Sequence, residues 1–168
     1  MKRSLGLYIH IPFCQAKCAY CDFYSMSGAT EENMQRYVDA LLLQMEDYSK
    51  AAKIYSVDTI FIGGGTPTAL SVKCLSEVIE GIYRWFNVSK NAEFTLEANP
   101  ATVSVSSLSK YRRAGVNRLS MGLQSANDDE LTALSRIHSK ADFEASYYAA
   151  RKAKFENINV DIMYGIPM

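Results

Sequence analysis

The feature that most constrains the fold is a regular alternation of short apolar runs and longer amphipathic stretches along the 168 residues. In the longer stretches, apolar residues recur every three or four positions, which is typical of helices. The runs that predict strands are LGLYIHI, SVDTIFIGGG, AEFTLEANP, VNRLSMGLQS and INVDIMYGIP. Nearly continuous apolar strands that alternate with helices predict a parallel sheet with right-handed crossovers. The sequence therefore predicts an α/β fold, either a barrel or an open doubly wound sheet.

Helices are expected between these runs, and most of them begin at a residue suited to capping. The first starts at about Thr30, and the acidic side chains that follow it favour a helix N-terminus. Ser71 opens the second, a short third helix ends near Gly115, and a fourth runs from Ser139 to about Lys154.

Composition excludes several classes of protein. Lys and Arg together number 18, as do Asp and Glu, so the formal net charge is zero and gives no support for a nucleic-acid footprint. No apolar run approaches the roughly 18 residues of a membrane span. The N-terminal MKRSLGLYIHIPF has basic residues before an apolar stretch, but Pro12 and the lack of a small-residue cleavage site favour a strand over a signal peptide. We expect a soluble, cytoplasmic protein.

A chemically useful residue lies at or near the C-terminal end of every predicted strand. Three cysteines follow the first strand, Gly63–Gly65 end the second, and Glu97 lies in the third; Gln124 closes the fourth, and Asp161 lies in the fifth. In parallel β/α folds these strand ends form the rim of the active site. We therefore expect the five features to meet at one mouth.

Cys14, Cys18 and Cys21 form a Cys-x3-Cys-x2-Cys loop without a fourth cysteine nearby. Such thiolates hold an iron–sulfur cluster or a zinc ion, and the zinc alternative would recruit His10 as a fourth ligand. The spacing favours the cluster, in which case something outside the protein completes the coordination. Cys74 stands alone in an amphipathic pattern and is expected to be a small buried residue.

The three cysteines, with Tyr20 just before the last of them, resemble the motif of the radical S-adenosylmethionine (SAM) superfamily. The wider stretch YIHIPFCxxxCxYCDFYS resembles the oxygen-independent coproporphyrinogen III oxidase-like family. The likeness continues through FIGGGTPT, FTLEANP, RLSMGLQS, LSRIHS and NVDIMYGIP and so covers essentially the whole chain.

This resemblance implies a partial (β/α) barrel of the radical SAM type, with parallel strands and outer helices. It implies that Cys14, Cys18 and Cys21 hold a [4Fe-4S] cluster whose fourth iron binds the amino and carboxylate groups of SAM. An electron from the cluster would then break the sulfonium and yield a 5′-deoxyadenosyl radical that abstracts hydrogen. The residues that the resemblance assigns to SAM are Tyr8, Tyr20, Gly64, Gly65, Thr66, Glu97, Gln124, Arg136 and Asp161.

Most of these assignments have a structural alternative, and the aromatic residues could equally belong to the core. The glycines could form a plain tight turn, and Glu97 could be a solvated residue at a strand end. Arg136 could be a surface residue, and Gln124 and Asp161 could hydrogen-bond a neighbouring loop. No residue is assigned to catalysis, and His138 is expected to make only a local hydrogen bond.

Within the family, Phe23 separates two branches. The true oxidase has a further cysteine two positions after the third ligand, whereas this chain has Phe23 there and resembles the haem-chaperone-like branch. The first hypothesis is a radical SAM protein of that branch, with a porphyrin or haem ligand and a flavodoxin- or ferredoxin-type electron donor. The second is a genuine oxidase that converts propionates to vinyl groups, and the third is a zinc-stabilised, non-catalytic interaction domain. An enzyme of the radical SAM oxidoreductase type is favoured.

The chain stops just after a predicted strand, with no helix to cover it. We therefore expect residues 1–168 to be the N-terminal part of a radical SAM barrel that is truncated at its C-terminus. The remaining barrel and a C-terminal domain would lie outside this chain, together with most porphyrin contacts.

Overall fold

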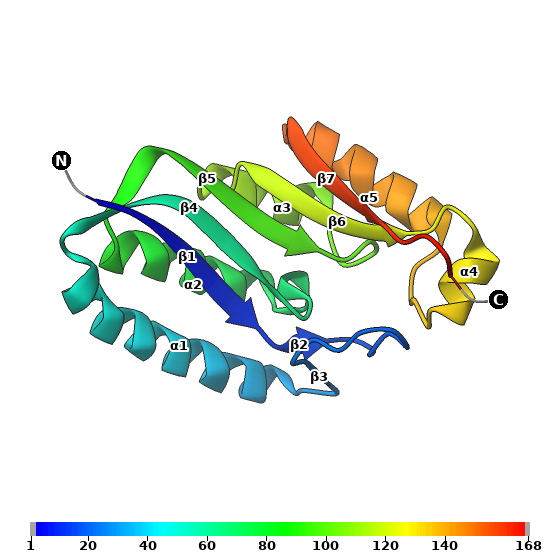
Figure 1. The fold of residues 1–168 in the computed structure, drawn as a ribbon, viewed down its shortest axis with the longest axis horizontal. Coiled ribbons are helices and arrows are strands. Elements are labelled where there is room, and N and C mark those ends of the chain that lie inside the picture. The colour runs from blue at the N-terminus through cyan, green and yellow to red at the C-terminus, as the bar shows by residue number, and fades with distance from the viewer. Residues whose placement is uncertain (1–2, 167–168) are drawn as a thin grey trace.

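A computed structural model describes residues 3–166 as one parallel sheet with helices along it (Figure 1). The strands of the main sheet are β1 (Arg3–Ile11), β4 (Tyr55–Gly64), β5 (Val88–Ala98), β6 (Arg118–Gln124) and β7 (Asn157–Ile162). The helices are α1 (Glu31–Ala52), α2 (Val72–Trp85), α3 (Val105–Arg113), α4 (Asp128–Ala133) and α5 (Lys140–Lys152). A 3-10 turn, η1 (Pro67–Ala69), follows β4, and two-residue strands β2 (Phe13–Cys14) and β3 (Met26–Ser27) pair with each other.

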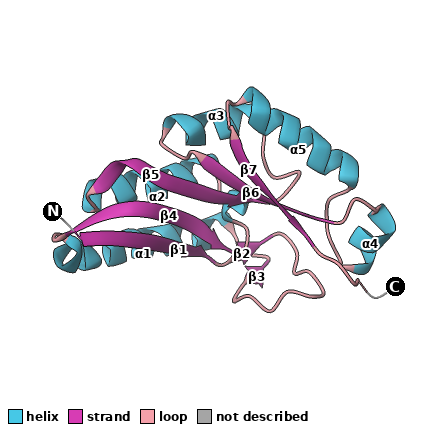
Figure 2. Ribbon diagram, turned by 45° about the horizontal axis from the view of Figure 1, so that its top comes forward, coloured by secondary structure: helices cyan, strands magenta, loops and turns pink. Residues whose placement is uncertain are grey.

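The strands lie in the order β1-β4-β5-β6-β7 and all are parallel (Figure 2). This order never reverses, so right-handed crossovers place the connecting helices on the same face of the sheet. A doubly wound sheet has helices on both faces, so the winding corresponds to part of a barrel. The predicted α/β class, with parallel strands and outer helices, is confirmed.

The core lies between the sheet and its helices. Alternate strand residues such as Ile62, Leu96 and Leu119 are fully buried and pack with helix residues such as Leu75 and Leu108. Burial of each such side chain is worth about 1.5–3 kcal/mol. The other face of the sheet carries the polar and glycine residues, and it forms the concave interior of the partial barrel.

The three predicted helix caps are confirmed. Thr30 accepts a hydrogen bond from the backbone of Asn33, Ser71 accepts one from Cys74, and Ser139 forms a reciprocal capping box with Asp142. Helix α4 and the β2–β3 pair were not predicted, because elements of six and two residues are too short to show a period. No helix within residues 3–166 is long and apolar enough to cross a membrane.

Candidate functional site

A cavity of about 460 Å³ opens where the strands end, beside the loop that carries the three cysteines. All three cysteines line it, together with eight of the nine residues assigned to SAM. These eight are Tyr20, Gly64, Gly65, Thr66, Glu97, Gln124, Arg136 and Asp161. Residues from each of the predicted strand ends therefore meet at one mouth, as the parallel topology requires.

The exception is Tyr8, which does not line this cavity. It lies on β1 and borders a separate groove of about 500 Å³ between β1 and α1. Its hydroxyl is 3.0 Å from Nδ1 of His10, and its ring stacks on Phe61 at a centroid distance of 6.2 Å. Burial raises the pKa of the Tyr8 phenol, and the nearby Glu97 carboxylate raises it further, so Tyr8 lies within electrostatic reach of the cavity wall.

The cysteine loop is held at both its base and its tip. At the base, β2 pairs with β3, and the backbone N–H of Met26 donates to the carbonyl of Pro12 at 2.7 Å. Near the tip, the N–H of Ala19 donates to the carbonyl of Leu134 at 3.1 Å. The loop is thus fixed against the sheet and against α4, and its three thiols are only partly exposed.

His10 forms a hydrogen bond with Tyr24, at the C-terminal end of the cysteine loop. Its Nε2 lies 2.9 Å from the carbonyl oxygen of Tyr24, and a carbonyl only accepts, so Nε2 carries the proton. Nδ1 then accepts from the Tyr8 hydroxyl. Since both ring nitrogens have partners, His10 is not placed to serve as a fourth zinc ligand.

The donor set fits a cluster better than a single ion. Among residues 3–166, no three His, Cys, Asp or Glu side chains converge closely enough to hold one metal ion. A cubic cluster gives each cysteine its own iron, so its thiolates stand farther apart than the ligands of one zinc. Three thiols around a shared cavity match that requirement.

Gly64 and Gly65 allow β4 to end directly against the cysteine loop. Gly64 has a φ of +114°, which disfavours a side chain, and a Cβ there would lie 2.5 Å from the His10 ring. At Gly65 a Cβ would lie 2.8 Å from the Phe13 carbonyl oxygen and 3.0 Å from Cys14 Sγ. The glycines therefore do more than form a turn, since they bring bare backbone beside the Cys14 thiol.

Glu97 lies on β5 and accepts a hydrogen bond from the Gly64 N–H at 3.0 Å. Burial raises the pKa of the Glu97 carboxyl, the Gly64 N–H lowers it in part, and the charge of Asp161 raises it again. Glu97 is thus a partly buried acid without a cationic partner among the described ion pairs. A bound cation beside it would favour its ionised form.

Arg136 extends from the segment after α4 into the same cavity. Its Nη1 lies 3.4 Å from Cys18 Sγ and 3.4 Å from the Tyr20 hydroxyl, and its Nη2 donates to the Gly122 carbonyl at 2.9 Å and to Asn99. Its Nε is buried without a hydrogen-bond partner. Arg136 is therefore not a free surface residue, since its Nη atoms are engaged in the cavity wall and its Nε is buried.

Gln124 and Asp161 complete the far wall. Gln124 has a φ of +67°, a conformation that costs free energy in a non-glycine residue and often accompanies a functional role. Its amide folds over Gly122, where a Cβ would lie 2.7 Å from Nε2. Asp161 accepts from Asn159 at 2.6 Å and from Ser120 at 3.3 Å, which holds its carboxylate in the cavity.

Sequence reasoning missed Asn99 and Ser120, which also line the cavity. Asn99 bonds Arg136 through its amide oxygen and lies 3.5 Å from the Thr66 hydroxyl through its amide nitrogen. A signal existed for Asn99, because it directly follows the strand that carries Glu97. Ser120 had none beyond its alternation with buried neighbours in β6.

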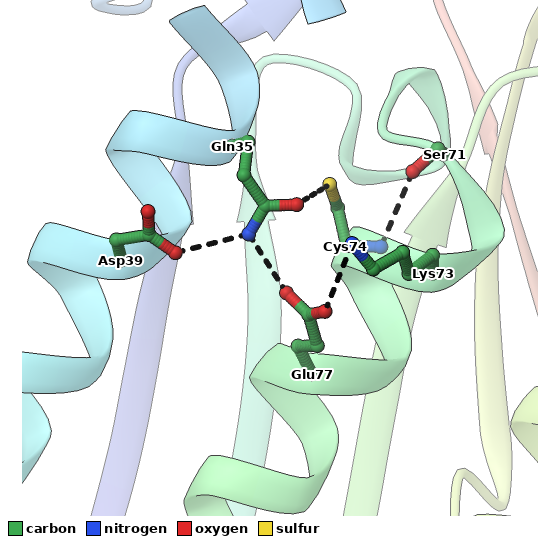
Figure 3. Close-up of polar contacts among 6 residues, drawn as sticks. All are labelled: Gln35, Asp39, Ser71, Lys73, Cys74 and Glu77. Atoms are coloured by element: carbon green, nitrogen blue, oxygen red, sulfur yellow. Dashed lines mark hydrogen bonds and ion pairs between the residues drawn. The ribbon is translucent and has the colours of Figure 1, made fainter. Parts of the chain in front are cut away.

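Cys74 is separate from the cysteine loop, as predicted. It is 2% exposed, and its thiol donates to the side-chain oxygen of Gln35 at 3.3 Å. Gln35 in turn donates to Asp39 and Glu77, and the network joins α1 to α2 (Figure 3). Cys74 therefore has a packing role between two helices.

His138 is buried beneath the Arg136 segment, and its Nε2 donates to the Leu123 carbonyl at 3.2 Å. Its Nδ1 has no partner, and burial, together with the positive charge of Arg136, lowers the pKa of the imidazole. The expected local hydrogen bond is thus present, and burial favours the neutral ring.

This lowered pKa predicts a loss of stability in mild acid. The unfolded chain protonates His138 near the ordinary pKa of about 6.5, whereas the folded chain resists protonation, so stability falls as the pH drops below that value. Thermal unfolding of the full-length protein at pH 7.5 and 5.5 should show a smaller shift in melting temperature for His138→Gln than for the unmodified protein. An equal shift in both would contradict this role.

Comparison with known proteins agrees with this geometry. The sequence profile described as "Radical SAM superfamily" matches residues 8–168. The chain belongs to the radical SAM superfamily.

Within that superfamily, the chain is similar to proteins named as haem chaperones. The chain is 40% identical over 163 residues to "Heme chaperone HemW" of Escherichia coli (strain K12), covering 97% of this chain and 43% of that protein. It is 41% identical over 161 residues to "Heme chaperone HemW" of Bacillus subtilis (strain 168), covering 95% of this chain and 42% of that protein. The chain therefore spans less than half the length of these relatives.

A solved structure gives the same result for the fold. The structure titled "Coproporphyrinogen III oxidase (HemN) from Escherichia coli is a Radical SAM enzyme" superposes with a TM-score of 0.91 at 29% identity, over 99% of this chain and 38% of that one. The predicted resemblance to the coproporphyrinogen III oxidase-like family and its haem-chaperone branch is confirmed. The assigned ligands of the cluster and of SAM remain predictions.

Proposed function

We propose that this radical SAM chain holds a [4Fe-4S] cluster and SAM within a haem-handling protein of the chaperone type. The observation that carries the proposal is the single cavity in which three thiols face a carboxylate, a guanidinium and bare glycine backbone. The likeness to haem chaperones and the presence of Phe23 where the oxidase has a cysteine favour the haem branch.

The residues that line the cavity fit both the [4Fe-4S] cluster and SAM. Cys14, Cys18 and Cys21 would each ligate one iron, and Nη1 of Arg136 donates toward Cys18 Sγ at 3.4 Å. When bound, the cluster would supply an electron to the SAM sulfonium and so generate a 5′-deoxyadenosyl radical that abstracts hydrogen.

The cavity wall would orient SAM through complementary charges. Glu97 would accept hydrogen bonds from the ammonium, and Arg136 would pair with the carboxylate through its forked donors. Gln124 and Asp161 would bond the ribose hydroxyls, and Gly64, Gly65 and Thr66 would let the methionine part approach the backbone. Tyr20 would pack beside the cofactor, and Tyr8 would act from the neighbouring strand.

A second candidate is a genuine oxygen-independent coproporphyrinogen III oxidase. The fold similarity to the solved oxidase supports it. Phe23 disfavours it, because that side chain lines the cavity and is 68% exposed at the position where a cysteine would stand. The zinc-stabilised interaction domain is disfavoured by the engagement of both His10 nitrogens.

We further propose that residues 1–168 form the N-terminal part of a longer barrel protein that works in the cytoplasm. The relatives extend well beyond the length matched here. A flavodoxin- or ferredoxin-type protein would supply the electron, and no nucleic-acid partner is proposed, given the zero net charge.

The test uses the full-length protein, reconstituted with iron and sulfide without oxygen. We expect it to bind haem and to cleave SAM when reduced, while it fails to decarboxylate coproporphyrinogen III. Absorbance titration, chromatography of 5′-deoxyadenosine and porphyrin analysis measure these three properties.

Efficient vinyl-group formation would instead identify the oxidase. One tightly bound zinc, with no iron, sulfide or SAM cleavage after anaerobic preparation, would support the interaction domain. Loss of the cluster in air alone would contradict neither radical SAM candidate.

A further inference from the structure

Arg118 lies on the concave face of the sheet, just below the cofactor cavity. Along β6, Leu119 and Met121 are fully buried toward the helices, whereas Ser120 and Gly122 line the cavity. Alternation in a strand places Arg118 on the same face as these two residues. It is two residues, or about 6–7 Å, deeper into the barrel than Ser120.

The parallel register places Arg118 in one row across the sheet. Tyr8 pairs with Phe61, Phe61 with Thr95, Thr95 with Arg118, and Arg118 with Asn157. These residues come from five strands that lie side by side (Figure 2). The row therefore crosses the interior of the partial barrel beneath the cavity.

Arg118 is partly buried and lacks an anion. Its Nη1 donates to the hydroxyl of Thr95 at 3.1 Å, and Thr95 is only 1% exposed, so the guanidinium lies over β5. All ion pairs within residues 3–166 involve lysines (Lys50, Lys73 and Lys140) and leave Arg118 with this one neutral partner. A guanidinium has five N–H donors, and partly burying its charge costs free energy that a bound anion would offset.

Two other arginines of the described residues have more hydrogen-bond partners than Arg118 has. Arg151 bonds the carbonyls of Phe155 and Glu156 and lies over the ring of Tyr147, and the Nη2 of Arg136 donates to Asn99 and to the Gly122 carbonyl. Glu97 is two residues from Thr95 on β5, but its carboxylate bonds the Gly64 backbone and makes no ion pair with Arg118. The free donors of Arg118 are therefore available within the barrel.

The other end of the row is aromatic. The rings of Tyr8 and Phe61 stack with an interplanar angle of 27°. Adjacent strands are about 4.8 Å apart, so Phe61 and Arg118, two strands from each other, are separated by roughly 10 Å along the sheet. An aromatic shelf at this distance from a guanidinium suits a flat ring system that carries carboxylates on short side chains.

We propose that Arg118 binds a propionate carboxylate of a tetrapyrrole that enters the barrel beneath the SAM cavity. This proposal rests on the proposed function and adds a specific ligand contact to it. Guanidinium and carboxylate bind through two parallel charge-assisted hydrogen bonds, which an amide cannot reproduce. Removing the charge of the carboxylate should therefore weaken tetrapyrrole binding as much as removing the arginine does.

The experiment measures the binding of haem, of coproporphyrin III and of haem dimethyl ester, whose propionates are uncharged, to the reconstituted full-length protein. In Arg118→Gln we expect the dissociation constant of haem to rise at least tenfold, because hydrogen bonds between charged groups are the stronger kind. The dissociation constant of the ester should be the same in this variant as in the unmodified protein. Arg113→Gln, which removes an exposed arginine on α3, is the matched control and should bind haem normally.

The outcomes separate this proposal from the proposed function. An unmodified protein that binds neither haem nor coproporphyrin III overturns the proposed function and the Arg118 contact with it. If Arg118→Gln binds haem and coproporphyrin III as tightly as the unmodified protein does, the contact alone is overturned. A selective loss for coproporphyrin III supports the contact and identifies the tetracarboxylate as its ligand, whereas loss of ester binding shows that Arg118 only maintains the barrel.

Discussion

Alanine in place of Cys14, Cys18 or Cys21 is expected to abolish cluster assembly. Each thiolate would ligate a different iron, and two thiolates do not retain a cluster that already relies on an outside ligand at its fourth iron. After anaerobic reconstitution of the full-length protein, the iron and sulfide content of each variant should fall to background. The visible absorption band of the cluster should disappear with it.

Cys74→Ala is the matched control, because it removes a thiol without touching the cavity. That thiol is buried between α1 and α2 and bonds only Gln35 (Figure 3). Iron content should equal that of the unmodified protein. If Cys74→Ala also loses its iron, or if one of the other three variants keeps it, the assignment of the ligands is wrong.

The fold was predictable from the sequence because its main signals are local. Each strand is a short apolar run, and Thr30, Ser71 and Ser139 cap the helices at the expected places. The apolar pattern alone did not decide between a barrel and a doubly wound sheet, since that depends on which face each crossover covers. The resemblance to the radical SAM superfamily implied the partial barrel that the strand order confirms. Helix α4 was missed because a single turn and a half shows no periodicity.

The site was predictable to the extent that topology determined it. Parallel strands bring their C-terminal ends together, so Glu97, Gln124 and Asp161 had to meet near the cysteine loop. The assignment of Tyr8 to SAM remains a prediction, and its position on the first strand did not reveal that its ring borders the neighbouring groove. Arg118 carried no motif, and only the register that aligns it with Thr95 and Phe61 makes it noticeable.

Glu97→Gln is expected to weaken SAM binding by about tenfold to a hundredfold. The carboxylate would lose its charge-assisted hydrogen bonds to the ammonium, which are worth about 1.5–3 kcal/mol. The glutamine keeps the shape of the side chain and can still accept the Gly64 N–H, so the fold should persist. Isothermal titration of SAM into the reconstituted full-length protein measures the change, and Glu93→Gln, an exposed glutamate on the same strand, is the matched control.

The pH dependence of that binding tests the charge itself. Burial raises the pKa of Glu97, so protonation removes its charge at a higher pH than for an exposed glutamate. Since only the ionised form pairs with the ammonium, SAM affinity of the unmodified protein should fall as the pH is lowered from 7 to 5. The Glu97→Gln variant should show a flat profile over this range, whereas Glu93→Gln should follow the unmodified protein. If the SAM affinity of Glu97→Gln still falls with pH, another group must take up the proton that weakens binding. Asp161 is the first candidate, because its negative charge raises the pKa of Glu97 and it lines the same cavity.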